Sequence, residues 1–455
     1  MTKLVKIALI REGKTPPDFR VALTPHQCQE LQKLYPQIQI VVETSPIRRF
    51  KDEEYAALGI PVLSDISDAD IMIGVKEVPD HQLISNKTYL FFSHTFKKQA
   101  YNAHLLKAIL EKNIRLVDYE ILKDRNGKRV IGFGRYAGIV GVFEGFRALG
   151  LKKGWYDLPS PMSCHDRKEM ESFGSKAHFK NPIKAVVTGW GRVGHGAEEM
   201  IRFFGLKKVD PQTFLSYQGE ENVYVHLDTA DYYKRISDGG FDKSEFYQSP
   251  EKYHSVLNEY VSQCDIYLAC HLWKSGNPVL LSKEDLIKEN HRCVVIADIS
   301  CDINGPIAST IKATTISDPF YGYDRNSGVE VDWRDSNAIM MMTIDNLPCE
   351  LPRDASEDFG QELMNSVIPA LLKENDPMIL GARNRKRAID ARLSISSRLR
   401  QQGIITPRYG PSLMLLFHQK IFWSKFQMRL CNQRLQTDPV SWIIDHLVIY
   451  EIPVP

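Results

Sequence analysis

Residues 183–206 read IKAVVTGWGRVGHGAEEMIRFFGL, and this stretch decides the fold of the second half of the chain. An apolar run typical of a buried strand leads into glycines spaced G-x-G-x-x-G, followed by an amphipathic helix pattern that ends at Gly205. This spacing permits a tight turn, close approach of the backbone to a pyrophosphate, and close packing of helix on strand. The helix start adds free N–H groups and a positive dipole. We therefore expect a dinucleotide here, and a tight turn without a ligand is the alternative. The predicted cofactor-binding residues of the turn are Gly189, Gly191, Arg192, Val193 and Gly194.

A carboxylate that holds the adenosine ribose should follow about 20 residues later, at the end of the second strand. Asp210 in LKKVDP is the nearest fit, although aspartate is also a common turn residue. If Asp210 binds both ribose hydroxyls, the cofactor is NAD, whereas Lys207 and Lys208 would allow NADP. Asp298 ends the predicted strand CVVIADIS, where it either faces the ligand crevice of such a sheet or forms a turn.

The first 130 residues alternate β-rich runs with helical patterns, which is the rhythm of a parallel sheet. The runs LVKIALI, IQIVVE and ADIMIGV predict strands, and TPHQCQELQKLY predicts a helix that starts at Thr24 with Pro25. RYAGIVGVFEGFRALGL predicts a long buried helix between domains, and the polar residues 155–181 predict a surface loop. Together these patterns favour an α/β fold with two Rossmann-like domains built on parallel sheets.

Composition excludes several classes of protein. A chain of 455 residues suggests two or three domains, and its apolar fraction of 43% is ordinary for globular proteins. No apolar run approaches the roughly 20 residues that cross a membrane, and the N-terminus lacks an export signal, so we expect a cytoplasmic protein without a membrane partner. The 8 cysteines have no zinc-ligand or C-x-x-C spacing, so we expect neither a metal site nor a disulfide framework.

Charge is distributed unevenly along the chain. Residues 383–455 hold 12 Lys and Arg against 4 Asp and Glu, whereas the whole chain has a formal charge of only +2. The remainder is therefore mildly acidic, and we expect no nucleic-acid partner.

Two further segments place reactive side chains at predicted strand ends. Residues 91–99, FFSHTFKKQ, change from an apolar strand to a histidine and two lysines, which could be a strand that runs into a basic helix start. Lys76 in GVKEVP likewise follows a strand and, taken singly, suits a solvated turn. Because the carboxyl ends of parallel strands point to the same crevice, Lys76 and His94 can converge there.

The motifs GVKEVP, FFSHTFKKQ, LVDYE, GFGRYAGIVG, GWGRVG and IDNLPCELPRDASE occur in this order. With them the chain resembles the saccharopine-forming branch of the alanine dehydrogenase and transhydrogenase superfamily, from about residue 5 to about residue 380. The resemblance implies two α/β domains with NAD or NADP in the cleft between them. It also implies reversible condensation of lysine with 2-oxoglutarate to saccharopine, with reduction by the nicotinamide. Arg135 departs from the pattern of the lysine-forming dehydrogenases, which leaves the subfamily open.

The resemblance also implies roles for single residues. The acid/base pair of the family falls on Lys76 and His94, whose side chains can titrate near neutral pH. The substrate-binding residues implied are Arg20, Glu77, Lys97 and Glu120. Asp345 stands where the family has an aspartate at the interdomain cofactor site. Arg20 and Lys97 could instead be surface charges, and Asp345 could form a turn before Pro348.

These patterns predict a division of the chain. A substrate domain takes residues 1–135 and 350–382, a connecting helix and linker take 136–180, and a Rossmann domain takes 181–349. Residues 383–455 do not resemble the family. We interpret them as an atypical basic tail, and our hypothesis is a shifted reading frame, with a lineage-specific basic helix as the alternative. The oligomeric state is open.

Three other functions are alternatives to a saccharopine-forming enzyme. An alanine dehydrogenase would use the same lysine and histidine on pyruvate and ammonia. A non-catalytic relative would bind NAD(P)H without lysine-dependent oxidation. A transhydrogenase subunit would need a membrane partner.

Overall fold

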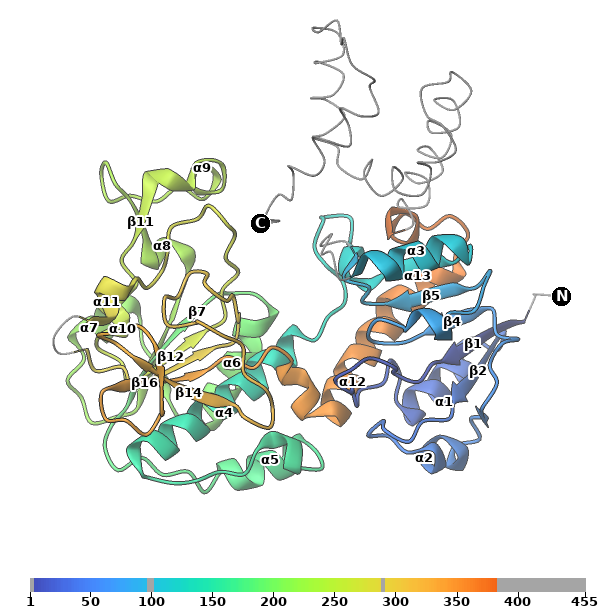
Figure 1. The fold of residues 1–455 in the computed structure, drawn as a ribbon, viewed down its shortest axis with the longest axis horizontal. Helices are drawn as coiled ribbons and strands as arrows, with labels where there is room; N and C mark the ends of the chain where they lie inside the picture. The colour runs from blue at the N-terminus through green and yellow to red at the C-terminus, as the bar shows by residue number, and fades with distance from the viewer. Residues whose placement is uncertain (1–3, 96–101, 288–290, 383–455) are drawn as a thin grey trace, which may run out of the picture.

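The computed structural model describes residues 4–95, 102–287 and 291–382. Figure 1 shows two α/β units, one built on a six-stranded sheet (blue to cyan) and one on an eight-stranded sheet (green to yellow and orange). We call them the six-stranded unit and the eight-stranded unit. Among the described residues, no helix is long and apolar enough to cross a membrane.

The six-stranded sheet is parallel throughout and has the order β3-β2-β1-β4-β5-β6. Its strands are β1 (Val5–Leu9), β2 (Ile38–Glu43), β3 (Val62–Leu63), β4 (Ile71–Ile73), β5 (Thr88–Phe91) and β6 (Arg115–Asp118). The helices between them are α1 (Pro25–Leu34), α2 (Asp52–Ala57) and α3 (Ala103–Glu111). The predicted start of α1 is confirmed, because the Thr24 hydroxyl accepts from the Gln27 N–H and the Gln27 side chain accepts from the Thr24 N–H.

The eight-stranded sheet has the order β15-β14-β16-β13-β12-β7-β9-β8, and its pairs are parallel except that β14 pairs antiparallel with both β15 and β16. Its strands are β7 (Lys184–Thr188), β8 (Lys207–Lys208), β9 (Val223–Leu227), β12 (Ile266–Ala269), β13 (Val295–Asp298), β14 (Phe320–Asp324), β15 (Glu330–Val331) and β16 (Ala338–Met342). A separate two-stranded antiparallel sheet pairs β10 (Tyr233–Arg235) with β11 (Tyr253–Ser255). The helices of this unit are α6 (Arg192–Phe203), α7 (Pro211–Ser216), α8 (Thr229–Tyr232), α9 (Lys243–Gln248), α10 (Asn258–Val261) and α11 (Lys283–Ile287).

The chain passes between the two units twice. The predicted long buried helix is α4 (Gly134–Lys153), which packs on the eight-stranded sheet. The return passes through α12 (Pro352–Glu362), the π-helical turn η8 (Leu363–Val367) and α13 (Ile368–Leu372), drawn in orange beside the blue strands in Figure 1. Apolar side chains from this return complete the core of the six-stranded unit, among them Phe359, Leu363 and Val367. The exact domain bounds remain a prediction.

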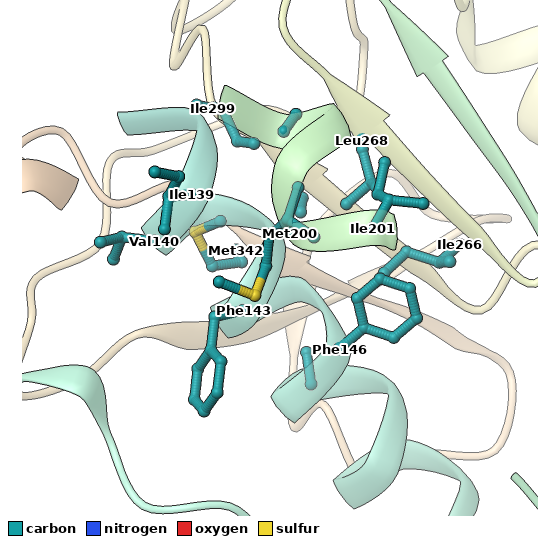
Figure 2. Packing of buried hydrophobic residues seen from close by; sticks show 14 of the residues in the cluster. Ile139, Val140, Phe143, Phe146, Met200, Ile201, Ile266, Leu268, Ile299 and Met342 are labelled. Atoms are coloured by element: carbon teal, nitrogen blue, oxygen red, sulfur yellow. The ribbon is translucent and has the colours of Figure 1, made fainter. Parts of the chain in front are cut away.

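Helices α4 and α6 cross backbone to backbone. A Cβ atom on Gly138 would lie 2.0 Å from the Val193 carbonyl oxygen, and one on Gly196 would lie 1.9 Å from the Arg135 carbonyl oxygen. Glycine is therefore required at both positions. Figure 2 shows part of the core between these helices and the sheet, where Phe143 and Phe146 of α4 lie with Met200 and Ile201 of α6. The start of the glycine-turn helix is thus fixed to the helix that connects the units.

A buried pair of carboxyl groups joins α4 to η7 (Leu347–Glu350). Glu144 and Glu350 are fully buried, and the charge of Glu144 acts on Glu350. Arg147 lies 3.1 Å from Glu144, and the Ser160 hydroxyl donates to Glu350 at 3.1 Å. Burial raises the pKa of both carboxyls, which favours a proton held within the pair.

The prediction of a loop over residues 155–181 is wrong in part. The segment contains η5 (Pro161–Ser163) and the helix α5 (Arg167–Gly174). Asp166 caps α5 by accepting from the Glu169 N–H, and Arg167 pairs with Glu171 one turn later. Two turns are too short to show a sustained period in a polar sequence.

Candidate active site

Four neighbouring strands of the six-stranded sheet deliver polar side chains just past their carboxyl ends. Glu12 follows β1, Lys76 follows β4, His94 follows β5, and Glu120 follows β6. Because these strands are parallel and adjacent, the four residues lie along one edge of the sheet. Lys76 and His94 therefore follow the ends of adjacent strands, and the convergence of their side chains stays a prediction.

Glu12 holds the backbone at Lys76. Its two carboxylate oxygens accept from the Val75 N–H at 2.7 Å and from the Lys76 N–H at 2.8 Å. Burial raises the pKa of Glu12 to about 8. Sequence reasoning missed this residue, although the rule that found Lys76, a polar side chain just past a buried strand, applies to it as well.

Lys76 titrates close to neutral pH. Burial lowers the pKa of its ammonium to about 8, and the positive charge of Arg20 acts in the same direction. A lysine in water would hold its proton up to a pH of about 10.4. Lys76 can therefore give up and regain a proton in the pH range where acid/base chemistry is useful.

His94 is oriented by Glu77. Its Nδ1 atom hydrogen-bonds a Glu77 carboxylate oxygen, and the other oxygen of that carboxylate lies 3.0 Å from the Lys14 ammonium. Burial alone would raise the pKa of Glu77, but His94 and Lys14 lower it to about 2, so the carboxylate stays charged. His94 has a φ of +50°, a backbone conformation that is strained for a non-glycine residue.

Arg20 is buried and already paired. Its guanidinium binds Asp18, and it donates to the Asn346 side chain at 3.1 Å. The structure therefore places Arg20 beside Lys76 as a fixed positive charge. Asp345, next to Asn346, is exposed beyond the end of β16. Lys97 lies outside the described residues.

Glu120 faces a cation that sequence reasoning missed. Its backbone N–H donates to Asp118 at 3.0 Å, and its carboxylate lies 3.9 Å from the Arg129 guanidinium. Arg129 also lies over the Phe92 ring, 5.3 Å from its centroid, and its side chain is 44% exposed. Its position in the polar stretch DRNGKR, residues 124–129, gives no sign of this role, because Glu120 and Phe92 lie outside that stretch.

The glycine turn has the geometry that a dinucleotide needs. Gly189 has a φ of +96°, and a Cβ there would lie 2.3 Å from the Cys270 carbonyl oxygen. A Cβ on Gly194 would lie 1.9 Å from the Gly189 carbonyl oxygen, which fixes the close packing of helix on strand. At Gly191, which caps α6, a Cβ would meet no described atom within 4 Å, so the backbone is open to a ligand. Val193 faces the other way, toward α4.

The expected position of the ribose carboxylate needs a correction. The strand beside β7 is β9, whereas Asp210 follows the outer strand β8 and caps α7 by accepting from the Gln212 and Thr213 N–H groups. Asp228 is the first residue after β9 and is exposed. Asp298 is fully buried and accepts from the Ser300 N–H, the Cys301 N–H and the hydroxyls of Ser300 and Thr310, so its carboxylate fixes a loop.

Arg192 also differs from expectation. Its guanidinium donates to Glu362 of α12 at 2.8 Å and to the Val130 carbonyl oxygen at 2.9 Å. These partners lie outside the glycine turn.

Comparisons with known proteins give relatives along most of the chain. Residues 8–140 match the family described as alanine dehydrogenase/PNT, N-terminal domain. The chain is 31% identical over 410 residues to the mitochondrial alpha-aminoadipic semialdehyde synthase of Mus musculus, a match that covers 81% of this chain and 44% of that protein. It therefore spans less than half the length of this relative. It is 27% identical to the saccharopine dehydrogenase (NAD(+), L-lysine-forming) of Emericella nidulans, over 81% of this chain and 93% of that protein.

Solved structures share the fold. An L-alanine dehydrogenase superposes with a TM-score of 0.56 at 17% identity, covering 83% of this chain and 94% of that one. A transhydrogenase from Sinorhizobium meliloti superposes with a TM-score of 0.51 at 15% identity, covering 80% and 93%. These likenesses confirm the predicted α/β fold with Rossmann-like parallel sheets.

Proposed function

Because the chain belongs to the alanine dehydrogenase and transhydrogenase superfamily, in the branch of saccharopine dehydrogenase and alpha-aminoadipic semialdehyde synthase, we propose that it catalyses the reversible, nicotinamide-dependent condensation of L-lysine with 2-oxoglutarate to saccharopine. The observation that carries the proposal is the placement of Lys76 and His94 at the ends of adjacent strands, with Lys76 held at a pKa of about 8.

The proposed chemistry requires proton transfers near neutral pH. When an amine adds to a ketone, the carbonyl oxygen gains a proton, and a further proton is needed as water leaves to form the imine. Lys76 can donate and recover such protons because its pKa is near 8. His94 is the second proton carrier: its Nδ1 faces Glu77, so Nε2 is the atom that would meet the substrate. A bound reduced nicotinamide supplies the hydride that reduces the imine.

The substrate site needs fixed cations, because saccharopine carries three carboxylates. We assign Arg129 to one of them, since its guanidinium is partly exposed and can form a bidentate pair. Glu120, beside it, would receive the ammonium of lysine. Glu77 orients His94, and Arg20 acts on the substrate through its charge beside Lys76. Lys97 and Asp345 keep their predicted roles as part of this proposal.

We propose NAD rather than NADP as the cofactor. Asp228 follows the strand beside the glycine turn, where a carboxylate accepts from the ribose hydroxyls and repels a 2′-phosphate. The two lysines that would have favoured NADP are both neutralised: Lys207 lies 2.9 Å from Glu221, and Lys208 lies 2.9 Å from Glu198. The open backbone at Gly191 and the N-terminus of α6 would receive the pyrophosphate.

An absorbance assay at 340 nm tests the function. NADH or NADPH is offered with 2-oxoglutarate and lysine, with 2-oxoglutarate and ammonia, and with pyruvate and ammonia. We expect NADH oxidation only when lysine and 2-oxoglutarate are present together. Turnover with pyruvate and ammonia would indicate an alanine dehydrogenase instead, and cofactor binding without turnover under any condition would indicate a non-catalytic relative.

A further inference from the structure

The first residue of the glycine-turn helix is bound to the other unit. Arg192 directly follows Gly191, and its guanidinium makes three hydrogen bonds: to a Glu362 carboxylate oxygen at 2.8 Å, to the Val130 carbonyl oxygen at 2.9 Å and to the Arg129 carbonyl oxygen at 3.2 Å. All three acceptors lie at the six-stranded unit or on the helix that returns to it. The side chain that sequence analysis assigned to the cofactor therefore links the two units.

Glu362 adds a second contact with the same segment. The carboxylate that binds Arg192 also accepts from the Gly132 N–H at 3.0 Å. The segment 129–132 is thus held at two carbonyl groups by Arg192 and at one N–H by Glu362. Backbone packing adds rigidity, because a Cβ on Gly134 would lie only 3.0 Å from Cβ of Arg192.

The segment held in this way carries a proposed substrate cation. Arg129 offers its carbonyl oxygen to Arg192 and its guanidinium to Glu120, at 3.9 Å. A short chain of contacts therefore runs from the N-terminus of α6, where a pyrophosphate would bind, through Arg192 to the guanidinium that would meet a substrate carboxylate.

We propose that Arg192 is a positioning residue that couples the two binding events: a dinucleotide at the glycine turn and a dicarboxylate at Arg129 each favour the other. This inference rests on the proposed function for the identity of the ligands. Phosphate bound at the start of α6 fixes the first turn of that helix, which fixes Arg192 and therefore the backbone of Arg129. By linkage the effect is reciprocal, so each ligand tightens the other by the same factor, expected to be about 5-fold to 20-fold.

The coupling is measured on the full chain by NADH fluorescence, titrated with and without saturating 2-oxoglutarate. The ratio of the two dissociation constants is the coupling factor. In Arg192→Gln we expect the ratio to fall to about 1, while the dissociation constant of NADH alone changes by less than about 3-fold. Glu362→Gln should lower the ratio too, and the double variant should be no lower than Arg192→Gln alone, because both residues act on the same segment.

Two further variants keep the test specific. Arg202→Gln removes an exposed arginine of the same helix whose partners, Glu198 and Tyr224, lie within the eight-stranded unit, and it should leave the ratio unchanged. Arg192→Lys keeps the charge but loses the fork that binds two carbonyls, so the ratio should fall partway. Far-UV circular dichroism and the thermal midpoint show that each variant is folded.

Three results would overturn the inference. The first is a coupling factor in Arg192→Gln equal to that of the unmodified chain. The second is at least 10-fold weaker binding of NADH alone in that variant with the coupling retained, which would make Arg192 a direct cofactor ligand. The third is an unmodified chain that binds both ligands without coupling, which leaves the turnover assay, and hence the proposed function, standing. A chain that binds neither ligand overturns both.

Discussion

At the scale of single residues, Lys76 and His94 should control the rate. Replacing either one with an uncharged side chain of similar size, in Lys76→Met and His94→Gln, removes a proton carrier and leaves the backbone contacts of Glu12 and Val75 in place. We expect each variant to lower kcat by about 100-fold or more in the 340 nm assay. Lys107→Met, on the exposed face of α3, is the matched control and should turn over normally.

The dependence of the rate on pH is a second test of the role of Lys76. Below a pH of about 8 Lys76 is mostly protonated, so the rate of saccharopine oxidation, which needs a base, should rise as the pH passes through this value. Lys76→Met should lack that rise. Near-normal rates in both variants would mean that these residues do not carry the protons.

Asp228 should decide the choice of cofactor. In Asp228→Ser the carboxylate that would accept from the ribose hydroxyls is lost, together with its repulsion of a 2′-phosphate. We expect KM for NADH to rise about 10-fold and KM for NADPH to fall, as measured by initial rates with each cofactor. The same substitution at Asp210, which caps α7 behind the outer strand β8, should leave the ratio of the two KM values unchanged. An equal effect at both positions would contradict the assignment.

The sequence locates a residue correctly in the fold where the end of a single strand fixes its position, and it fails where the order of strands in the sheet decides. Lys76, His94 and the glycines of the turn are visible as polar or flexible residues that follow apolar runs. Asp210 fits the expected spacing because it follows the next run along the chain, but the two-residue strand β8 lies outside β9, and only the sheet shows which strand is the neighbour of β7. Arg129 and Arg192 depend on contacts with distant segments, which one sequence does not reveal.

At the scale of elements, the carboxyl pair between α4 and η7 makes stability depend on pH. Burial raises the pKa of Glu350 in the folded state, so its contribution to stability is full below the unfolded pKa, near 4.3, and is lost as the pH rises through the folded value. Glu350→Gln cannot lose a proton and should flatten this dependence. We expect the variant to be more stable than the unmodified chain by about 1 to 3 kcal/mol at pH 9, and similar at pH 5.

Urea unfolding at pH 5 and at pH 9, followed by far-UV circular dichroism, measures this difference. Glu259→Gln replaces an exposed glutamate and should run parallel to the unmodified chain. If Glu350→Gln lost stability between the two pH values as steeply as the unmodified chain, the pair would not hold the proton.

Whether a helix can be predicted from the sequence depends on the length of its apolar pattern. The 20-residue helix α4 is predicted within about one residue of its start, because small and apolar residues extend over five turns. The 8-residue helix α5 is missed, because its stability comes from the Asp166 cap and ion pairs such as Arg167 with Glu171. Such polar contacts leave no apolar period in the sequence.

At the scale of the whole molecule, the return helix α12 should control the stability of the six-stranded unit. Phe359 stacks on Phe133, with ring centroids 4.4 Å apart, and meets Tyr119 edge-on at 5.3 Å. Phe359→Ala should cost about 3 to 5 kcal/mol. Hydrogen exchange read by mass spectrometry should show faster exchange in β1, β4 and β5, while β7 and β12 keep their protection.

Tyr247→Ala, which removes an aromatic ring that is 59% exposed, is the control and should change neither unit. Equal acceleration in both sheets would mean that the two units unfold as one.

The return of the chain is implied by the resemblance, whereas the hypothesis of a shifted reading frame concerns residues 383–455, outside the described residues. Intact mass and the gene sequence decide that question.

The return of α12 also sets the order in which the protein can mature on the ribosome. The first sheet is synthesised first, yet the aromatic and aliphatic side chains that close its core come from residues 359–382. The apolar cluster on one face of the second sheet lies between residues 186 and 341, so that face can collapse while translation continues. The core of the first sheet is therefore completed last, although its strands are synthesised first. Until residues 359–382 leave the ribosome, its apolar face stays exposed, and chaperones can bind it.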